Sequence, residues 1–262
     1  MDFISIIMPS HNSSEFITES VNSVLSQSHT SLELIVIDDG STDNTVNLIK
    51  QLAKTDQRII LLERTTCSNR PATPRNEGVK IARGDYLAFI DSDDLWHPQK
   101  ISLQLAAMDT HKLNFISSFH IRFSKIAPDF KQLPDQPEEI IKQSHANLIR
   151  KNNIITSSSL IKRDFFGNLQ FDQSDEYSGI EDYLAWLNLH QKEETNSGIL
   201  AMPLVHYRLR PNSYSSSKIM MAKKIFYLLN NYEYRGNKLG LRKYFYFMTY
   251  ALLAIKNRLS IN

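Results

Sequence analysis

The stretch Tyr86-Leu87-Ala88-Phe89-Ile90-Asp91-Ser92-Asp93-Asp94 decides the fold class of this chain. Its apolar first half is typical of a buried strand, which delivers several carboxylates together to the strand's carboxyl end. Open α/β sheets bind their ligands at that end. Carboxylates separated by one residue can share a hard divalent cation and leave room for phosphate oxygens. The same spacing also occurs in capping or solvated turns, so the spacing alone leaves both interpretations open.

Two earlier strands end in the same way. The run at 34–37 leads into Asp38-Asp39-Gly40-Ser41-Thr42-Asp43, and the run at 4–8 leads into Pro9-Ser10-His11-Asn12. Gly40 permits a turn, Ser41 or Thr42 can cap the next helix, and Asn12 with Glu15 resembles a capping box. Since the carboxyl ends of parallel strands lie at one edge of a sheet, these polar residues are expected to converge. The pattern predicts an α/β fold with a mostly parallel central sheet flanked by helices.

The rest of the chain is less regular. Apolar or alternating stretches predict strands at 59–62, 115–123 and 154–161. Helical spacing predicts helices at 74–82, from 97 onward and at 180–189. Prolines and acidic residues at 128–139 predict an exposed, mobile loop.

Five segments carry a recognisable order along the chain: Met8–Asn12, Ser20–Ser28, Glu33–Thr45, Pro74–Gly78 and Asp91–Asp94. Taken together, they resemble the opening of a family 2 glycosyltransferase, and weaker matches follow at Glu181-Asp182 and at 207–213. The strong part covers about residues 4–110. One departure is His11, where the family usually has Tyr, and an imidazole can also stack flat on a base.

The resemblance implies a GT-A nucleotide-diphospho-sugar transferase fold. We expect a catalytic domain at residues 1–210, with a nucleotide-sugar half at 1–110 and an acceptor half at 111–210. A helical C-terminal extension is expected at 211–262.

The resemblance also implies roles for individual residues. Asp39 is expected to accept the ring N–H of a uracil-like base, with His11 stacked near that base and Arg75 in support. Asp91 is expected near the ribose, and Asp93 is expected to bind Mg²⁺ or Mn²⁺ at the diphosphate. The rest of the expected substrate-binding set is Pro9, Asn12, Ser92, Arg208 and Arg210. The two arginines are expected to close over the diphosphate beside a lid that includes Ser213–Ser217.

The acidic pair Glu181-Asp182 begins a predicted helix. An inverting sugar transfer needs a base for the acceptor hydroxyl, and a carboxylate at a helix start could serve. From the residues alone, two acids in a first turn could instead only complement the helix dipole. The family's base matches Asp182, which leaves Glu181 as a supporting residue or an acceptor contact. For Arg75, a surface salt bridge is the plain alternative to a ligand contact.

The predicted function is inverting transfer of a sugar from a nucleotide-diphosphate sugar, with UDP-sugar favoured, to a saccharide or lipid-linked acceptor in surface polysaccharide or lipooligosaccharide synthesis. A non-catalytic nucleotide-sugar binder and a metal-dependent phosphohydrolase are the alternatives. Phosphohydrolases that use Asp-x-Asp carry it after an early strand with Thr or Val two residues further on, whereas here the motif comes late and Leu95 follows Asp94.

Composition agrees with an enzyme that works in the cytoplasm. Of 262 residues, 42% are hydrophobic and 22% charged, and a net charge of +2 carries no nucleic-acid signature. The single Cys67 excludes an intrachain disulfide and suits a reducing compartment. We expect neither a signal peptide nor a membrane span, because no basic-then-apolar leader and no apolar run of about 20 residues is present.

The C-terminal stretch 218–258 mixes basic residues with aromatics. Basic residues that flank Tyr, Phe and Leu suit an interfacial helix at the inner face of an anionic membrane. A helix pair that packs on the catalytic domain, with its basic residues in water, fits the same composition.

Overall fold

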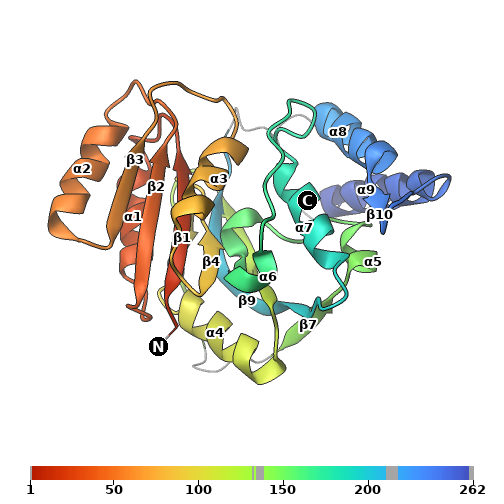
Figure 1. Cartoon of the computed structure of the whole chain (residues 1–262), viewed down its shortest axis with the longest axis horizontal. Helices are drawn as coiled ribbons and strands as arrows, with labels where there is room; N and C mark the ends of the chain where they lie inside the picture. The colour runs from red at the N-terminus through yellow and green to blue at the C-terminus, as the bar shows by residue number, and fades with distance from the viewer. Residues whose placement is uncertain (1, 132, 134–138, 211–217, 260–262) are drawn as a thin grey trace.

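The first seven-residue buried stretch forms β1 (Ile4–Ser10), the strand around which half of the sheet is built. β1 pairs in parallel with β2 (Leu32–Asp38) on one side and with β4 (Tyr86–Phe89) on the other. β3 (Ile59–Glu63) extends this parallel group beyond β2. The carboxyl ends of β1, β2 and β4 therefore meet at one edge, as the sequence predicted (Figure 1).

The other half of the sheet is mixed. The strand order is β3-β2-β1-β4-β8-β6-β9-β5, with β7 also paired to β9. The two longest strands, β6 (Phe115–Phe123) and β9 (Ser197–Arg208), run in parallel. β8 (Leu160–Lys162) is antiparallel to both β4 and β6. The short strands β5 (Leu95–Trp96) and β7 (Ile140–Gln143) are antiparallel to β9. The α/β class with a large central sheet is confirmed, and the antiparallel pairings are confined to short stretches.

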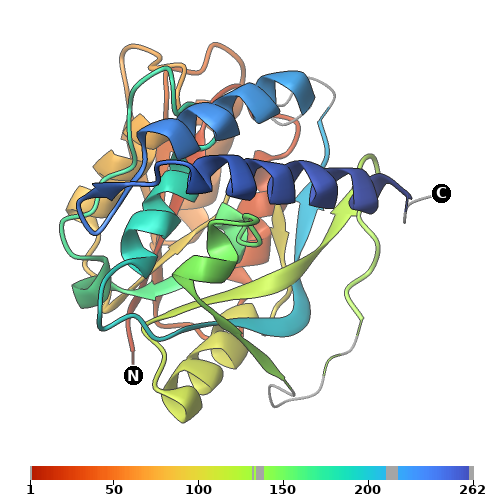
Figure 2. The same ribbon diagram turned by 90° about the vertical axis from the view of Figure 1, so that its right-hand side faces the viewer.

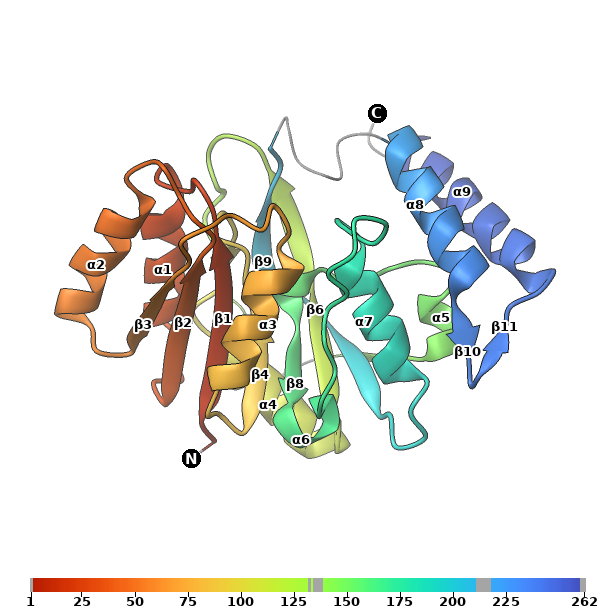
Figure 3. The same cartoon turned by 45° about the horizontal axis from the view of Figure 1, so that its top comes forward.

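Helices cover both faces of this sheet (Figure 3). Successive residues of β1 point to opposite faces, so Ile6 joins one hydrophobic cluster and Ile7 joins the other. Both faces are buried, which explains the continuous apolar runs of the parallel strands. The helices packed in the first cluster are α1 (Ile17–Leu25), α2 (Thr45–Thr55) and α4 (Lys100–His111). Those packed in the second include α3 (Ala72–Ile81), α5 (His145–Leu148), α6 (Arg163–Phe166) and α7 (Glu181–His190).

The C-terminal elements form a helical hairpin, as expected. α8 (Lys218–Asn231) and α9 (Arg242–Leu259) lie side by side, joined through β10 (Glu233–Tyr234) and β11 (Asn237–Lys238) (Figure 2). Buried residues of α8, such as Leu228, share a cluster with Trp186 of α7. The inner face of the hairpin thus packs on the catalytic domain.

One predicted strand was wrong in part. Residues 154–161 were expected to be extended throughout, but Thr156–Ser158 form a 3₁₀ turn, η1, and β8 starts only at Leu160. The hydroxyls of this stretch bind carbonyls within the turn, which favours the turn over a ladder. The strand β9 was not predicted, and a register shift opposite Phe119 interrupts its pairing with β6.

The computed structural model describes residues 2–131, 133, 139–210 and 218–259. The predicted lid residues Ser213–Ser217 and much of the predicted loop at 128–139 lie outside this part. The expected domain boundary at residue 210 lies next to residues 211–217, which are outside the described part, and it stays a prediction. Among the described residues, no helix combines the length and the apolar character needed to span a bilayer.

Candidate active site

A cleft of about 1070 Å³ opens at the carboxyl edge of the sheet, and every site residue predicted from the sequence lines it. The ends of β1, β2 and β4 contribute one wall. The start of α7 brings Glu181 and Asp182, and the end of β9 brings Arg208 and Arg210. The expected convergence of these residues is therefore present, while their individual roles remain predictions.

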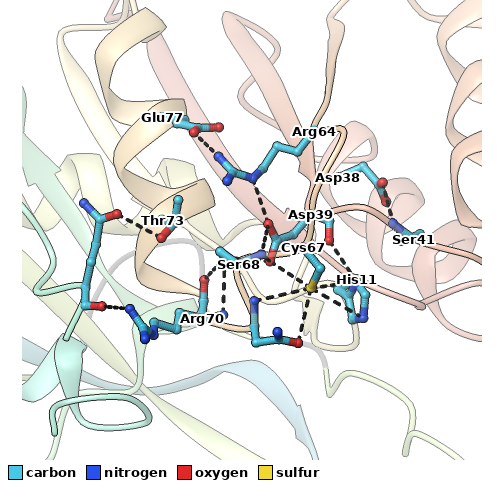
Figure 4. A network of polar contacts seen from close by, with 12 residues as sticks. His11, Asp38, Asp39, Ser41, Arg64, Cys67, Ser68, Arg70, Thr73 and Glu77 are labelled. Atoms are coloured by element: carbon cyan, nitrogen blue, oxygen red, sulfur yellow. Dashed lines mark hydrogen bonds and ion pairs between the residues drawn. The ribbon is translucent and has the colours of Figure 1, made fainter. Parts of the chain in front are cut away.

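Asp39 lies buried at the end of β2, in the polar network of Figure 4. Its Oδ1 is 2.8 Å from Nε of Arg64, which also pairs with Glu77. The Ser68 hydroxyl donates to Oδ2 at 2.7 Å, and the Ser68 N–H donates to both oxygens at 3.0 Å. A carboxylate offers about four acceptor positions. A base N–H could therefore bind Asp39 by replacing one of the contacts that the protein now makes to it, such as that of the Ser68 hydroxyl.

His11 and Asn12 join the end of β1 to the loop after β2. Nδ1 of His11 lies 3.0 Å from the Asp39 carbonyl oxygen, which can only accept, so Nδ1 carries the proton. The other ring nitrogen then accepts from the Asn12 amide at 3.2 Å. Asn12 has a φ of 47°, and its side-chain oxygen accepts the Thr42 N–H at 2.8 Å. The His11 ring remains exposed and accessible to a stacking partner.

Both capping predictions in this region were wrong. α1 begins only at Ile17, and no side chain caps it, since the oxygen of Asn12 is bound to Thr42. The Ser41 hydroxyl donates instead to Asp38 at 2.5 Å. Asp43 accepts the N–H of Thr45, the first residue of α2, at 3.0 Å. Asn12 binds the neighbouring loop and Ser41 binds back to Asp38 within its own loop, so neither side chain is available to cap a helix.

Arg75 on α3 joins the two halves of the cleft. Its guanidinium donates to Asp91 at 2.7 Å and to Glu181 at 2.6 Å. Arg75 thus forms ion pairs, as the alternative to a ligand contact had it, but its side chain is 5% exposed, so these pairs are buried and not on the surface. Burial lowers the pKa of Arg75, but the charges of Asp91 and Glu181 outweigh this and raise that pKa above its ordinary value. The positively charged guanidinium of Arg75 thus bridges the end of β4 and the start of α7.

The four residues of the acidic motif have different surroundings. Asp94 is fully buried, and it accepts the Arg208 N–H at 2.9 Å and the Ser157 hydroxyl at 2.5 Å. The Ser92 hydroxyl shares a hydrogen bond with Ser13. Asp93 lines the cleft, and its Oδ2 lies 3.6 Å from Arg210. Burial raises the pKa of Asp93 to about 6, and the charge of Asp91 adds to this.

The carboxylate oxygens of this motif are of the type that binds divalent cations such as Mg²⁺ and Mn²⁺. Asp93 and Asp91 face the cleft as hard oxygen donors whose negative charges repel, and a Mg²⁺ or Mn²⁺ ion would relieve that repulsion. Across the described residues, no group of three or more carboxylate, histidine or cysteine side chains converges as a ready-made metal site. The remaining ligands would have to come from the diphosphate or water, and the metal site stays a prediction.

Arg208, the last residue of β9, and Arg210, two residues later, differ in what they can reach. Arg208 donates to the Asp93 carbonyl at 2.8 Å, pairs with Glu19 at 2.7 Å and lies over the ring of Phe123. Its side chain is 5% exposed. Arg210 is 42% exposed. Arg210 can therefore turn toward a diphosphate at smaller cost than Arg208.

Asp182 lies in the first turn of α7, opposite the donor wall. It accepts the Thr156 hydroxyl at 2.8 Å and the Tyr183 N–H at 2.6 Å. Burial raises the pKa of Asp182 to about 6, with Glu181 adding to the rise and Arg75 opposing it. A carboxylate with such a pKa is ionised at neutral pH and basic enough to take a proton. Its bond to the Tyr183 N–H also satisfies the helix start, so the dipole role and the base role are compatible.

Residues 5–169 of the chain match the family described as Glycosyl transferase family 2. The chain belongs to this family. The resemblance noted from the sequence is thereby confirmed, and the chain is a glycosyltransferase.

Relatives support the assignment over nearly the whole length. This family 2 glycosyltransferase is 32% identical to TuaG of Bacillus subtilis (strain 168), named as a candidate teichuronic acid biosynthesis glycosyltransferase, over 98% of this chain and 97% of that one. It is 33% identical to WfaP of Escherichia coli, a UDP-Glc:alpha-D-GlcNAc-diphosphoundecaprenol beta-1,3-glucosyltransferase, over 83% of this chain and 82% of that one. Its fold resembles residues 1–349 of Staphylococcus aureus TarS in complex with UDP, with a TM-score of 0.69 and 20% identity over 95% of this chain and 70% of that one. The expected GT-A fold is confirmed.

Several residues that shape the site were not singled out from the sequence. Ser68 and Arg64 hold Asp39, while Thr156 and Ser157 hold the carboxylates on the two sides of the cleft. The run Thr156-Ser157-Ser158-Ser159 between apolar residues was the available signal, because four buried hydroxyls in succession need partners.

Proposed function

We propose that this family 2 glycosyltransferase moves a sugar from a UDP-sugar to a saccharide on a lipid-linked acceptor of a surface polysaccharide, with inversion at the anomeric carbon. The observation that carries the proposal is the cleft itself, where Asp182 lies across from the acidic motif and Arg75 ties the two together. The printed names of WfaP and of the TarS complex, with UDP-Glc, a diphosphoundecaprenol acceptor and UDP, support the substrate classes.

In the proposed reaction, Asp182 takes the proton from the acceptor hydroxyl while that oxygen attacks the anomeric carbon opposite the diphosphate. The new C–O bond forms as the bond to the diphosphate breaks, so the configuration inverts without a covalent enzyme intermediate. Arg210, partly exposed beside Asp93, is placed to meet the charge that grows on the leaving group. A divalent cation held by Asp93 would supply further neutralisation of that charge.

The test is to incubate the purified chain with a panel of UDP-sugars, Mn²⁺ and a polyprenyl-diphosphate saccharide, and to measure UDP release. We expect release that depends on the acceptor and a product of inverted configuration by NMR. Tight UDP binding without turnover on any donor would favour a nucleotide-sugar binder. Phosphate release from simple phosphomonoesters would favour the phosphohydrolase alternative.

Donor binding by Asp39 gives a separate prediction. Asp39→Ala should weaken UDP binding by about 10- to 100-fold, because a hydrogen bond to a charged group is worth about 1.5–3 kcal/mol. Ser68→Ala should preserve or strengthen it, since the serine hydroxyl occupies the carboxylate in the free protein. Calorimetry with UDP, with and without Mn²⁺, measures both variants. Equal weakening by the two substitutions would show that Ser68 is part of the bound site instead.

The same calorimetry tests whether Asp93 holds the metal ion that strengthens UDP binding. Asp93→Asn should remove the part of UDP affinity that Mn²⁺ adds and leave the metal-free affinity unchanged. Unchanged Mn²⁺ dependence in this variant would reject Asp93 as the ligand.

We also propose that the chain works in the cytoplasm at the inner face of a membrane, touching it through α9. Residues 218–262 carry nine lysines and arginines but a single acid, Glu233. Large exposed side chains recur at helical spacing on one face of the hairpin: Leu241, Tyr244, Phe245, Met248 and Leu252. An apolar stripe within a basic segment suits an anionic lipid surface. The free Cys67 fits the reducing compartment.

Sedimentation with lipid vesicles tests the membrane proposal. We expect binding to vesicles that contain phosphatidylglycerol, and little binding to pure phosphatidylcholine. Phe245→Ser with Met248→Ser should lower that binding about tenfold or more, because each substitution removes apolar contact area. Ile126→Ser, at a residue that is 88% exposed outside the hairpin, is the matched control. Equal binding by the control and the double variant would contradict the assignment.

A further inference from the structure

Two adjacent residues of the turn η1 contact the acidic groups on both sides of the cleft. The Thr156 hydroxyl donates to Oδ2 of Asp182 at 2.8 Å. The Ser157 hydroxyl donates to Oδ2 of Asp94 at 2.5 Å and accepts the Asp91 N–H at 3.0 Å. Thr156 is 5% exposed and Ser157 is fully buried. One peptide unit therefore separates the contact to the candidate base from the contacts to the acidic motif.

The turn itself is held from the neighbouring elements. Trp96 of β5 donates its indole N–H to the Ser157 carbonyl at 2.7 Å, and Gln104 of α4 donates to the Ser158 carbonyl at 2.8 Å. Lys100 is fully buried, donates to Gln104 at 2.8 Å and lies 3.9 Å from the centre of the Trp96 ring. Because Trp96 and Gln104 both bind carbonyl oxygens of η1, the turn has little freedom to shift. The hydroxyls of Thr156 and Ser157 therefore keep fixed positions.

We propose that η1 is a positioning element of the transferase, in which Thr156 orients the Asp182 carboxylate and Ser157 sets the acidic motif, so that one turn fixes the spacing between base and donor. This inference rests on the proposed role of Asp182. Thr156 lines the cleft with its hydroxyl bound to Asp182, and Ser157 lies behind the cleft wall.

The two hydroxyls should have separable effects. A donor to a carboxylate favours its ionised form, so loss of the Thr156 hydroxyl should raise the pKa of Asp182. The charged groups that act on this carboxylate are Glu181 beside it on α7 and Arg75 on α3. Both remain in a Thr156→Val variant. Ser157 does not contact Asp182, and its loss should act on the donor side alone.

The experiment compares Thr156→Val, Thr156→Ser and Ser157→Ala in the full chain. Since the base must be ionised to act, kcat/KM in the wild-type protein should fall as pH drops through about 6. Thr156→Val should move this acid limb up by about one pH unit, whereas Thr156→Ser should leave it in place. Ser157→Ala should weaken UDP binding by up to about tenfold, because the acidic motif loses a bond that sets its position, and it should not move the limb.

Carbon-13 NMR of the aspartate carboxyls, with Asp182 assigned from the spectrum of Asp182→Asn, reports the same pKa without any turnover. That measurement separates failure of this inference from failure of the proposed activity. An Asp182 titration unchanged in Thr156→Val, or moved as far in Thr156→Ser, would overturn the assignment of Thr156. UDP affinity unchanged in Ser157→Ala would overturn that of Ser157. Thermal melts of each variant establish that it is folded.

Discussion

Asp182→Asn should lower kcat by about 10²–10⁴ while UDP binding persists, the range that loss of a general base typically produces. Asparagine keeps the size of the side chain, and its amide oxygen can still accept the Tyr183 N–H while its NH2 group donates to the Thr156 hydroxyl oxygen. It cannot take a proton from the acceptor. The variant should therefore fold and bind donor normally, and only the chemical step should slow. UDP release under single-turnover conditions measures this directly.

The matched control is Asp109→Asn, which removes a carboxylate that is 88% exposed on α4 and should leave turnover unchanged. Near-normal turnover in Asp182→Asn with the true acceptor would move the base to another group, with Glu181 the first to test. Glu181 is bound by both Arg75 and the Gly179 N–H, so it is the less available of the two carboxylates. A product of retained configuration would exclude the proposed mechanism whatever the rate.

The donor side of the cleft could be predicted from the sequence because its residues directly follow strands that are recognisable in the sequence. β1, β2 and β4 are mostly apolar, and the residues that follow each strand lie at the sheet edge by connectivity alone. Placing Asp39 and Asp91 on one edge therefore required only the strand pattern and a parallel sheet. The resemblance then added what geometry could not supply, namely that Asp182 belongs to the same site.

The contacts across the cleft could not be predicted in the same way. Arg75 meets Glu181, 106 positions further along the chain, and no periodic pattern links the two. Arg208 lines the cleft as expected, but its contacts with Phe123 and Glu19, which hold the side chain there, left no pattern in the sequence. The hydroxyl run at η1 was taken for a strand because its partners, Asp94 and Asp182, come from distant segments. A run of polar residues shows that hydrogen-bond partners are needed, but when those partners are distant in sequence, the run does not show which residues they are.

Arg75→Met should cost about 3–5 kcal/mol of stability, the usual result of removing one partner from a buried ion pair. Methionine fills similar volume but leaves Glu181, 4% exposed, and Asp91 without their shared counter-charge. Arg75→Lys should recover only part of the loss, because a single ammonium cannot offer the planar fork that reaches both carboxylates. Urea denaturation at neutral pH gives the free energy of unfolding for each variant.

Arg83→Met is the control that separates a buried guanidinium from an exposed one. Arg83 also pairs with a buried carboxylate, Glu33, but its own side chain is 69% exposed. The Glu33 carboxylate would keep its bonds from the Ser5 hydroxyl and the backbone N–H at position 83, so this variant should lose far less. A loss in Arg75→Met that matches the loss in Arg83→Met would mean that Arg75 acts through packing and not through its charge.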